Sequence, residues 1–250
     1  MMVLVLIVAG LGVVALLMVL FAPHIRKYSA GGACMSMARL DGKTVLITGA
    51  NTGIGKETAL DLAIRGARVI MACRDVEKGE EAAAFIRRIY CKANVEVREL
   101  DLADTSSIRA FAQRFLREVN HLHILINNAG VMMCPYMKTK DGFEMQLGVN
   151  HLGSSVTVNS VHPGSVRSDL VRHSTVMSLL FSLFSMFLKS PRDGAQTSIY
   201  CAVAEELHSL TGKHFSDCAP AFVAPQGRKE ETAKKLWDAS SELLGIVWDD

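Results

Sequence analysis

The chain has 250 residues, of which 50% are hydrophobic, and its formal net charge is only +2 at pH 7. This composition is enough for one sizeable core, and the near-neutral charge excludes a strongly basic surface, so no nucleic-acid partner is expected. Six cysteines occur without a C-x-x-C pair, which excludes the usual zinc and dithiol redox motifs, so no metal site is predicted.

An apolar segment without charged side chains, Met1 to Ala22, opens the chain. At about 1.5 Å per residue, a helix of this length crosses a hydrocarbon core of roughly 30 Å. Arg26 and Lys27 follow directly, and positive charge on this flank predicts that it stays in the cytoplasm. A cleaved signal peptide would normally have a positive first region and a shorter apolar core. The sequence therefore predicts an uncleaved transmembrane anchor over residues 1–22 and a linker over residues 23–41.

Short apolar segments and amphipathic segments alternate from residue 42 to residue 250. This alternation is typical of an α/β fold, a doubly wound parallel sheet of the Rossmann type with helices on both faces. Strands are predicted over residues 44–48, 68–72, 95–100, 123–126 and 158–161. Helices are predicted over residues 56–66, 77–89, 106–119 and 233–244, the last with an apolar face available to the core, formed by Leu236, Trp237, Leu243 and Leu244.

One apolar segment, Val176 to Leu188, does not fit this alternation and is too short to span a membrane. Two interpretations of it remain open. It is either a buried helix or flap of the domain, or a lid that touches the membrane over an apolar substrate site.

A glycine-rich sequence, TGANTGIG from Thr48 to Gly55, lies directly between the first strand and the first helix of the domain. Glycine allows the sharp turn and lets a phosphate approach the backbone, and the helix N-terminus offers free N–H groups to a pyrophosphate. A merely tight turn is the alternative, but the strand–turn–helix setting favours a dinucleotide site. The residues predicted to bind the cofactor here are Gly49, Asn51, Thr52, Gly53, Ile54 and Gly55.

The position after the second strand indicates which nicotinamide cofactor is bound. An NAD-binding chain usually has an acidic residue here to accept hydrogen bonds from the ribose 2′-hydroxyl, but this chain has Cys73 followed by Arg74. A guanidinium group cannot accept those hydrogen bonds but suits a 2′-phosphate, so this sequence favours NADP(H). The alternative is a solvated arginine that pairs with Asp75 or Glu77.

Further candidate residues follow the third and fourth strands. Asp101, next to Leu102, is placed to meet the adenine amino group, and the sequence NNAG puts amides and small residues at the carboxyl edge of the sheet. Ligands of open α/β sheets bind at this edge. A structural role for Asn127 remains open. The predicted cofactor site therefore also includes Asp101, Leu102, Asn128, Ala129 and Gly130.

Four motifs in this order, TGANTGIG, NNAG, VNHLG and HPGSV, resemble those of the short-chain dehydrogenase/reductase family. The closer resemblance is to the membrane-anchored retinol dehydrogenases of vertebrates, of the microsomal and photoreceptor type, and it covers nearly the whole chain. It implies NADPH-linked interconversion of retinal and retinol, or of other apolar aldehydes and alcohols. It further implies a single-pass protein of the endoplasmic reticulum membrane with its domain in the cytosol, and a nicotinamide end bound near Pro163 and Gly164.

The resemblance ends at the point in the chain where the catalytic residues of the family would follow. Catalysis in the family uses an Asn, a Ser that orients the carbonyl, a Tyr that gives the proton and a Lys that lowers the pKa of that Tyr. Asn150 in VNHLG matches the first, but Gly153 is followed at once by SSVTVNSVHPG. In the family roughly seventy to eighty residues, enough for a β-α unit, separate HLG from HPG. The sequence therefore predicts an internal deletion near residues 153–154, with the Ser, Tyr and Lys absent.

Three features imitate the missing residues. Tyr136 has Lys140 four residues further on, but the preceding proline and the turn-like sequence that follows predict a loop, not a helix presenting both side chains. Ser154 and Ser155 precede a strand, whereas the serine of the family ends one, and His162 before a proline is more typical of a turn. None of them is predicted to replace the missing acid.

Three interpretations of the chain follow. The first is an anchored NADP(H)-dependent oxidoreductase that turns over substrate, although loss of a general acid alone typically costs 10²–10⁴-fold. The second is a non-catalytic anchored remnant that binds NADP(H) or forms homo- or hetero-oligomers with related chains. The third is a spliced product without a stable fold. For a folded chain, we expect a shortened helix near residues 143–152 and the late strand in the vacated place beside the fourth strand.

Overall fold

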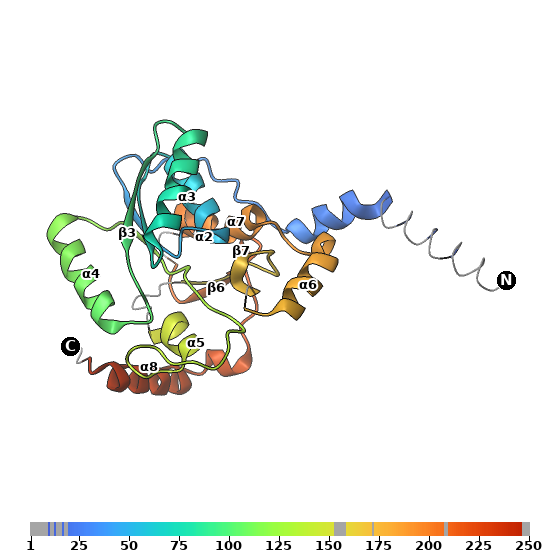
Figure 1. Cartoon of the computed structure of the whole chain (residues 1–250). Coiled ribbons are helices and arrows are strands. Elements are labelled where there is room, and N and C mark those ends of the chain that lie inside the picture. Colours follow the sequence, from blue (N-terminus) through green and yellow to red (C-terminus); the bar gives the residue numbers. More distant parts are fainter. Residues whose placement is uncertain are drawn as a thin grey trace.

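The computed structural model describes residues 20–152, 159–171, 173–207 and 210–246, together with residues 10, 13 and 17. Most of the predicted anchor, and the predicted join near residues 153–154, therefore lie outside the described residues. Residues 20–30 form a helix that projects from the body of the domain (Figure 1). Within the part of the chain that the structure describes, no helix is both long enough and apolar enough to cross a membrane.

The body of the domain is a four-stranded parallel sheet with the strand order β3-β2-β1-β4. Its strands are β1 (Thr44–Thr48), β2 (Arg68–Cys73), β3 (Asn94–Glu99) and β4 (Ile124–Ile126). The helices between them are α2 (Gly53–Ile64), α3 (Val76–Ile89) and α4 (Thr105–Glu118). These elements confirm the predicted alternation, with boundaries that differ from the predicted ones by at most three residues.

Side chains from the two faces of the sheet enter separate clusters because helices cover both faces. Val45 and Ile47 of β1 pack with residues of α2, α3 and α7 (Pro191–Val203) on one face. Leu46 lies on the other face, in a cluster with Phe111 of α4. Every residue of β1 is buried, as expected for a central parallel strand that is covered on both sides.

Side-chain caps determine where two of the helices begin. The carboxylate of Asp75 accepts a hydrogen bond from the Lys78 N–H at the start of α3. At the start of α7, the Ser190 hydroxyl accepts from the Asp193 N–H, and the Asp193 carboxylate accepts from the Ser190 N–H. Pro191 fills the first helical position, where its missing N–H costs nothing. These reciprocal bonds satisfy donors that a helix start otherwise leaves open.

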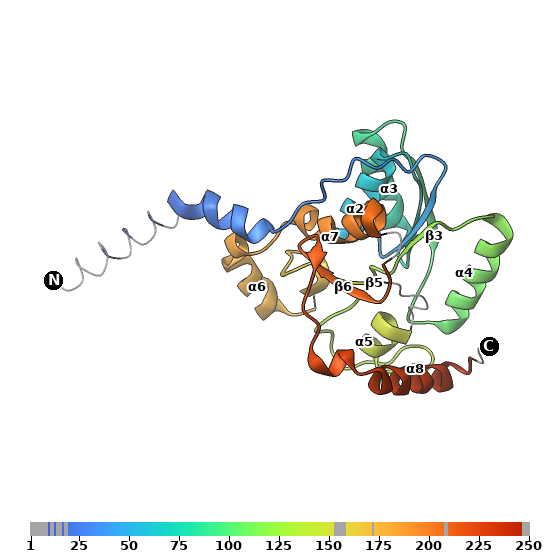
Figure 2. The same ribbon diagram turned by 180° about the vertical axis from the view of Figure 1, so that it is seen from behind.

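The chain after the predicted join forms a second, separate sheet with the order β5-β6-β7 (Figure 2). β5 (Asn159–His162) pairs in parallel with β6 (Lys213–Ser216), and β6 pairs with the short antiparallel strand β7 (Ala219–Pro220). The prediction that the late strand slides beside β4 is therefore wrong. The Asn159 side chain is part of the reason, because it donates to the Leu210 carbonyl and accepts from the Lys213 N–H. The fold is Rossmann-like α/β, but its sheet is in two pieces.

Helical segments lie directly before the predicted join and, beyond β5, after it. Before it, α5 (Met145–Leu147) continues into a π-helical turn (Gly148–Leu152), in keeping with the shortened helix predicted there. After it, the apolar segment forms α6 (Thr175–Leu183) and a 3₁₀ turn (Ser185–Phe187), and no residue of either is buried. The interpretation of this segment as a buried helix is therefore wrong, whereas its interpretation as a lid stays a prediction.

The C-terminal helix α8 (Glu230–Leu244) lies at the end of the domain near α5 (Figure 1). The prediction that its apolar face packs on the core is wrong, since Leu236, Trp237 and Leu243 are 54%, 55% and 52% exposed. Hydrogen bonds tie the helix to the domain, since its Ser240 hydroxyl bonds the ring of His151 and its Leu244 carbonyl accepts from Arg109 of α4. The apolar face of α8 is thus left in solvent because the helix is tied to the domain from another side.

Candidate functional site

The glycine-rich loop between β1 and α2 has a backbone that favours glycine at two positions. Gly49 and Gly53 have φ angles of 63° and 56°, in the left-handed region. Thr52 precedes α2 with an extended backbone, and its hydroxyl makes no capping hydrogen bond to the helix. The Thr52 hydroxyl therefore does not occupy the first N–H groups of α2. A helix N-terminus of this kind suits a pyrophosphate.

The sequence NNAG after β4 holds the glycine-rich loop in place. The Asn128 amide donates to the carbonyl oxygens of Thr48 at 2.9 Å and Gly49 at 3.1 Å. The Thr48 hydroxyl accepts from the N–H groups of Asn128 at 3.1 Å and Ala129 at 3.0 Å. The approach requires glycine, because a Cβ on Gly49 would lie 2.8 Å from Ala129 Cα. Asn128 and Ala129 thus reach the predicted site, where they brace the loop.

The end of β2 presents a neutral thiol and an exposed cation. Burial raises the pKa of the Cys73 thiol to about 11, although the N–H of Asn51 faces its sulfur, so the thiol is uncharged at pH 7. Arg74 is exposed and forms no ion pair with any described residue, whereas Asp75 pairs with Lys78 at 3.0 Å. The structure therefore does not show the alternative arrangement in which Arg74 pairs with a neighbouring carboxylate.

Asp101 and Leu102 lie just past β3. Asp101 makes hydrogen bonds within its own loop, and Leu102 makes apolar contacts. One carboxylate oxygen of Asp101 accepts from the Ala103 N–H at 2.9 Å, and the Asp101 N–H donates to the Ser107 hydroxyl at 3.1 Å. Leu102 packs against the cluster on the α4 face of the sheet, which gives it a structural role. The second carboxylate oxygen of Asp101 is the atom left to meet an adenine amino group.

Asn150, the one predicted catalytic residue, is held by the main chain of the loop after β4. Its amide donates to the Val131 carbonyl at 2.9 Å and accepts from the Val131 N–H at 2.8 Å. This two-point contact fixes the π-helical turn against the NNAG loop, and a Cβ on Gly130 would lie 3.4 Å from Asn150 Oδ1. Asn150 therefore positions the loop at the site and does not itself act as an acid.

The segment that follows the turn at Pro163 and Gly164 reaches the glycine-rich loop from beyond the predicted join. A Cβ on Gly53 would lie 3.4 Å from Ser168 Cβ, so the two segments are in contact. Gly164 has a φ of 84°, and a Cβ there would lie 2.8 Å from Lys189 Cε. Lys189 is buried and packs against this turn, although no sequence motif marks it. The structure therefore brings the segment after this turn to the glycine-rich loop through Ser168, whereas Gly164 itself lies against Lys189.

The sequence predicts that Tyr136 and Lys140 do not form a proton-donating dyad, and the structure agrees. Both residues lie in an irregular loop, and the Tyr136 side chain is 80% exposed. The Lys140 ammonium instead pairs with Asp104 at 2.7 Å, and hydrogen bonds from Lys140 and Ser106 lower the pKa of Asp104 to about 2. Another tyrosine, Tyr200, packs edge-on against an aromatic ring in the second sheet and is also unavailable to the site.

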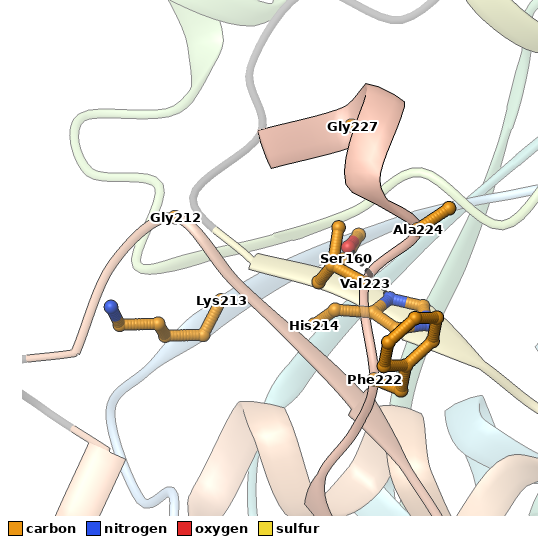
Figure 3. A pocket seen from close by; sticks show the side chains of 8 residues that line it. All are labelled: Ser160, Gly212, Lys213, His214, Phe222, Val223, Ala224 and Gly227. Atoms are coloured by element: carbon orange, nitrogen blue, oxygen red, sulfur yellow. Dashed lines mark hydrogen bonds between the residues drawn. The ribbon is translucent and has the colours of Figure 1, made fainter. Parts of the chain in front are cut away.

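A separate cavity of about 260 Å³ lies on the second sheet (Figure 3). Its lining residues are Ser160, Gly212, Lys213, His214, Phe222, Val223, Ala224 and Gly227. The Ser160 hydroxyl lies 2.9 Å from His214 Nδ1, but a hydrolytic triad needs a third group to orient the histidine, and no lining residue is acidic. The cavity contains no predicted cofactor residue, so it is distinct from the candidate site.

The sequence profile of the family described as short chain dehydrogenase matches residues 43–150. Human retinol dehydrogenase 12 is 48% identical, over 91% of this chain and 94% of that protein. Mouse retinol dehydrogenase 11 is 47% identical, over 92% of this chain and 95% of that protein. The solved structure of an uncharacterised protein from Mycobacterium paratuberculosis is 29% identical, with a TM-score of 0.66, over 88% of this chain and 100% of that chain.

The alignment with the human protein is longer than the chain itself. It extends over 298 positions, whereas 91% of 250 residues is about 228, so about 70 positions of the human protein face a gap in this chain. A gap of this length is large enough to hold a strand and a helix with their connections.

Proposed function

We propose that this chain, which belongs to the short-chain dehydrogenase family, is a retinol dehydrogenase-type oxidoreductase that binds NADP(H) but lacks the proton donor of its relatives. The family consists of oxidoreductases that use nicotinamide cofactors. Because the relatives are named retinol dehydrogenases, the proposed substrate is a retinoid or another apolar aldehyde or alcohol. The observation that carries the proposal is the contact of Ser168 with Gly53, which brings the chain beyond the predicted join to the glycine-rich loop.

The residues at the site fit a nicotinamide dinucleotide. The N-terminus of α2 would hold the pyrophosphate, and the segment that contains Pro163 and Gly164 would hold the nicotinamide end, since Ser168 further along that segment lies against Gly53. The free carboxylate oxygen of Asp101 would accept a hydrogen bond from the adenine amino group. When bound, the cofactor gives or takes a hydride at its nicotinamide ring.

The end of β2 supports NADP(H) rather than NAD(H). Cys73 stands where an acidic residue would bind the ribose 2′-hydroxyl, and its thiol is neutral because burial raises its pKa. The adjacent Arg74 is exposed and has no carboxylate partner among the described residues. A 2′-phosphate would therefore meet a guanidinium group, while the neighbouring Asp75 carboxylate pairs with Lys78.

The missing proton donor limits turnover. Hydride transfer to an aldehyde leaves negative charge on the oxygen, and a positioned acid must neutralise it. Asn150 cannot donate a proton, and Tyr136 lies in an exposed loop with Lys140 engaged elsewhere. The gap of about 70 positions against the human relative supports a deletion near residues 153–154 that removed the Ser, Tyr and Lys. We expect turnover about 10²–10⁴-fold below that of an intact relative.

A non-catalytic role is the second candidate, and the division of the sheet favours it. β4 ends the order of the four-stranded sheet, and no described strand pairs with its outer edge. A chain of this kind could bind NADP(H) without turnover or pair with related chains through the uncovered edge.

The proposed location is the endoplasmic reticulum membrane, with a single span over residues 1–22, a linker over residues 23–41 and the domain of residues 42–250 in the cytosol. The uncharged segment Met1 to Ala22 and the basic residues Arg26 and Lys27 after it support this orientation. The projecting helix of residues 20–30 includes the last residues of that segment (Figure 2).

The direct test compares retinal reduction by the purified full chain and by human retinol dehydrogenase 12, both in detergent with NADPH. The proposal expects a rate about 10²–10⁴-fold lower for this chain, with NADPH binding measured in the same sample. Turnover equal to that of the human protein would contradict the proposal that this chain lacks a proton donor. Absence of NADPH binding would overturn the cofactor assignment.

A further inference from the structure

The segment α6 and the 3₁₀ turn after it present one apolar stripe to solvent. Residues 174–188 contain no charged side chain. The exposed members of the stripe, called the α6 surface below, are Val176 (66%), Leu179 (70%), Leu180 (40%), Leu183 (73%), Phe184 (51%) and Phe187 (50%). Their spacing of three and four residues places them along one side of a helix.

The serines at the start of this segment make local hydrogen bonds. The Ser178 hydroxyl donates to the carbonyl of the buried residue Val171 at 3.3 Å, and Ser174 caps the first turn by accepting from the Met177 N–H. Met177 and Phe181 lie on the half-buried side of α6, whereas Ser178 and Ser182 are exposed, so the helix is apolar on its inner side as well as along the exposed stripe. Such a helix is typical of a segment that covers an apolar phase.

An ion pair with one buried partner fixes the α6 surface to the start of the domain. Lys189, directly after the apolar segment, is buried and pairs with Asp217. Gly31, directly after the projecting helix of residues 20–30, lies against this pair, since a Cβ there would be 2.7 Å from Lys189 Nζ. The C-terminal ends of the two helical segments therefore meet at one point, and both figures show α6 beside the projecting helix (Figures 1 and 2).

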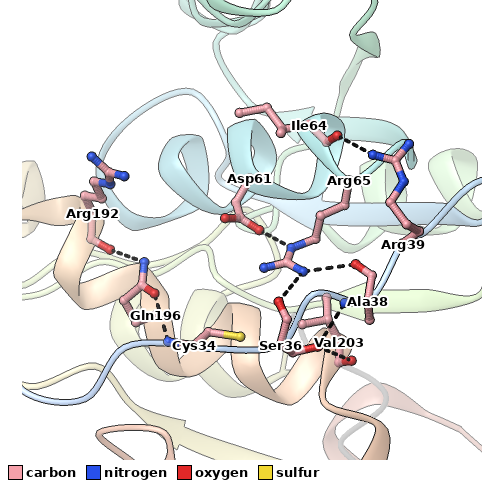
Figure 4. Close-up of polar contacts among 10 residues, drawn as sticks. All are labelled: Cys34, Ser36, Ala38, Arg39, Asp61, Ile64, Arg65, Arg192, Gln196 and Val203. Carbon is pink, nitrogen blue, oxygen red and sulfur yellow. Dashed lines mark hydrogen bonds and ion pairs between the residues drawn. The ribbon is translucent and has the colours of Figure 1, made fainter.

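The linker after Gly31 is bound along the domain rather than loose (Figure 4). The Cys34 N–H donates to Gln196 of α7 at 3.0 Å, and Arg65, the residue directly after α2, donates to the carbonyl of Ser36 at 2.8 Å. Because two helices of the core hold the linker, the projecting helix leaves the domain at a fixed place next to α6.

We infer that the α6 surface docks on the same lipid bilayer that the N-terminal segment enters. The occupant is a lipid surface because the neighbouring element continues into Met1 to Ala22, a segment without charged side chains that is long enough to span a bilayer. Arg26 and Lys27 on the projecting helix add the positive charge that suits anionic headgroups at that depth. The inference rests on the proposed anchor and gives the domain a second, shallower membrane contact.

A tryptophan reporter in the full chain tests this contact. The two natural tryptophans are first removed (Trp237→Phe, Trp248→Phe). Leu183→Trp then places the reporter on the α6 surface, and Leu116→Trp, at a residue of α4 that is 78% exposed at the opposite end of the domain, is the matched control. Both variants are reconstituted into phosphatidylcholine vesicles with and without bromine on the acyl chains.

The inference predicts that brominated lipid quenches the reporter at position 183 at least twofold and leaves the reporter at position 116 unchanged. An unquenched reporter at position 183, in a chain that floats with the vesicles, overturns the docking but keeps the anchor. A chain that does not float overturns both. A blue-shifted but unquenched reporter at position 183 shows that a second protein copy covers the surface, and this also contradicts the inference.

Discussion

Ser168 lies against Gly53, although the predicted join separates the two residues in the chain, and a Cβ on Gly53 would be 3.4 Å from the Ser168 Cβ. The packing of α7 on α2 explains how this contact is kept. A Cβ on Gly194 of α7 would lie 2.5 Å from Val166 Cγ2 and 3.3 Å from Ile54 Cγ1, so only glycine lets these segments approach so closely. The contact does not pass through the missing block, and the cofactor site can therefore form without it.

Arg74→Ala should weaken the binding of NADPH about tenfold or more and leave the binding of NADH nearly unchanged. Hydrogen bonds to a charged group contribute about 1.5–3 kcal/mol, and only the 2′-phosphate of NADPH offers one to this guanidinium. Fluorescence titration of both cofactors measures the two effects. Lys78→Ala, which removes a nearby cation already paired with Asp75, is the control and should change neither affinity by much. Equal losses for the two cofactors would contradict the role given to Arg74.

Gly49→Ala should weaken NADPH and NADH binding alike, by at least tenfold, because the added Cβ would press on Ala129 Cα at 2.8 Å and displace the loop. Gly42→Ala separates this clash from backbone strain. Gly42 has a similar φ of 74°, but a Cβ there would meet no heavy atom within 4 Å, so this variant carries the strain without the clash. Both variants should lose stability, but cofactor affinity should fall only in Gly49→Ala. Equal affinity in the two variants would show that the close approach of the loops is unimportant for binding.

Insertion of the block of about 70 residues from human retinol dehydrogenase 12 between Gly153 and Ser154 should restore retinal reduction by at least 10²-fold. The reason is that the block would supply the acid that protonates the aldehyde oxygen. The same insertion with its Y-x-x-x-K tyrosine replaced by phenylalanine is the control and should remain near the level of the shortened chain. Equal rates for the two insertions would mean that the block acts only on folding. In the shortened chain, Tyr136→Phe should not change the rate.

The pair of Lys140 and Asp104 should make the stability of the chain fall in acid. The pKa of Asp104 is lowered to about 2 in the folded chain, so the pair stabilises the fold fully above the ordinary carboxyl pKa near 4 and loses its effect as the pH falls towards 2. Asp104→Asn keeps a capping oxygen for α4 but removes the charge. Its melting temperature in detergent should depend less on pH between 4 and 2 than that of the unmodified chain. Parallel curves would contradict this assignment.

Local patterns in the sequence predicted the half of the fold that comes before the join. β1 can be predicted from its apolar residues, and the loop after it from the glycines of Thr48 to Gly55. Both predictions use only residues that are neighbours in the chain. The pairing of β5 could not be predicted in the same way, because its partner β6 is short and lies beyond α7. The exposure of Trp237 was missed for a related reason, since an amphipathic pattern shows that a helix has an apolar face but not whether anything covers it.

The candidate site shows the same division. Gly49 and Arg74 could be selected because their roles depend on the residues next to them in the chain. Lys189 could not, because its position under Gly164 and its pairing with Asp217 arise only when three distant segments meet. Asn128 was selected for the cofactor, and the structure adds that its amide braces the loop through Thr48.

The origin of the shortened chain can be read directly from its transcript and gene across codons 153–154. An in-frame coding block there with a serine and a Y-x-x-x-K sequence would identify this chain as a spliced form of an intact dehydrogenase. A gene without such a block would place the deletion in the gene itself, and the predictions for cofactor binding would be the same in either case.

Equilibrium titration of the full chain with NADPH, followed by cofactor fluorescence in detergent, tests the central claim most directly. The central claim is that the cofactor half of the site forms although the catalytic block is missing. It predicts saturable binding at one site per chain, which Gly49→Ala abolishes or weakens at least tenfold. A linear, unsaturable signal that is the same for the unmodified chain and for Gly49→Ala would contradict it.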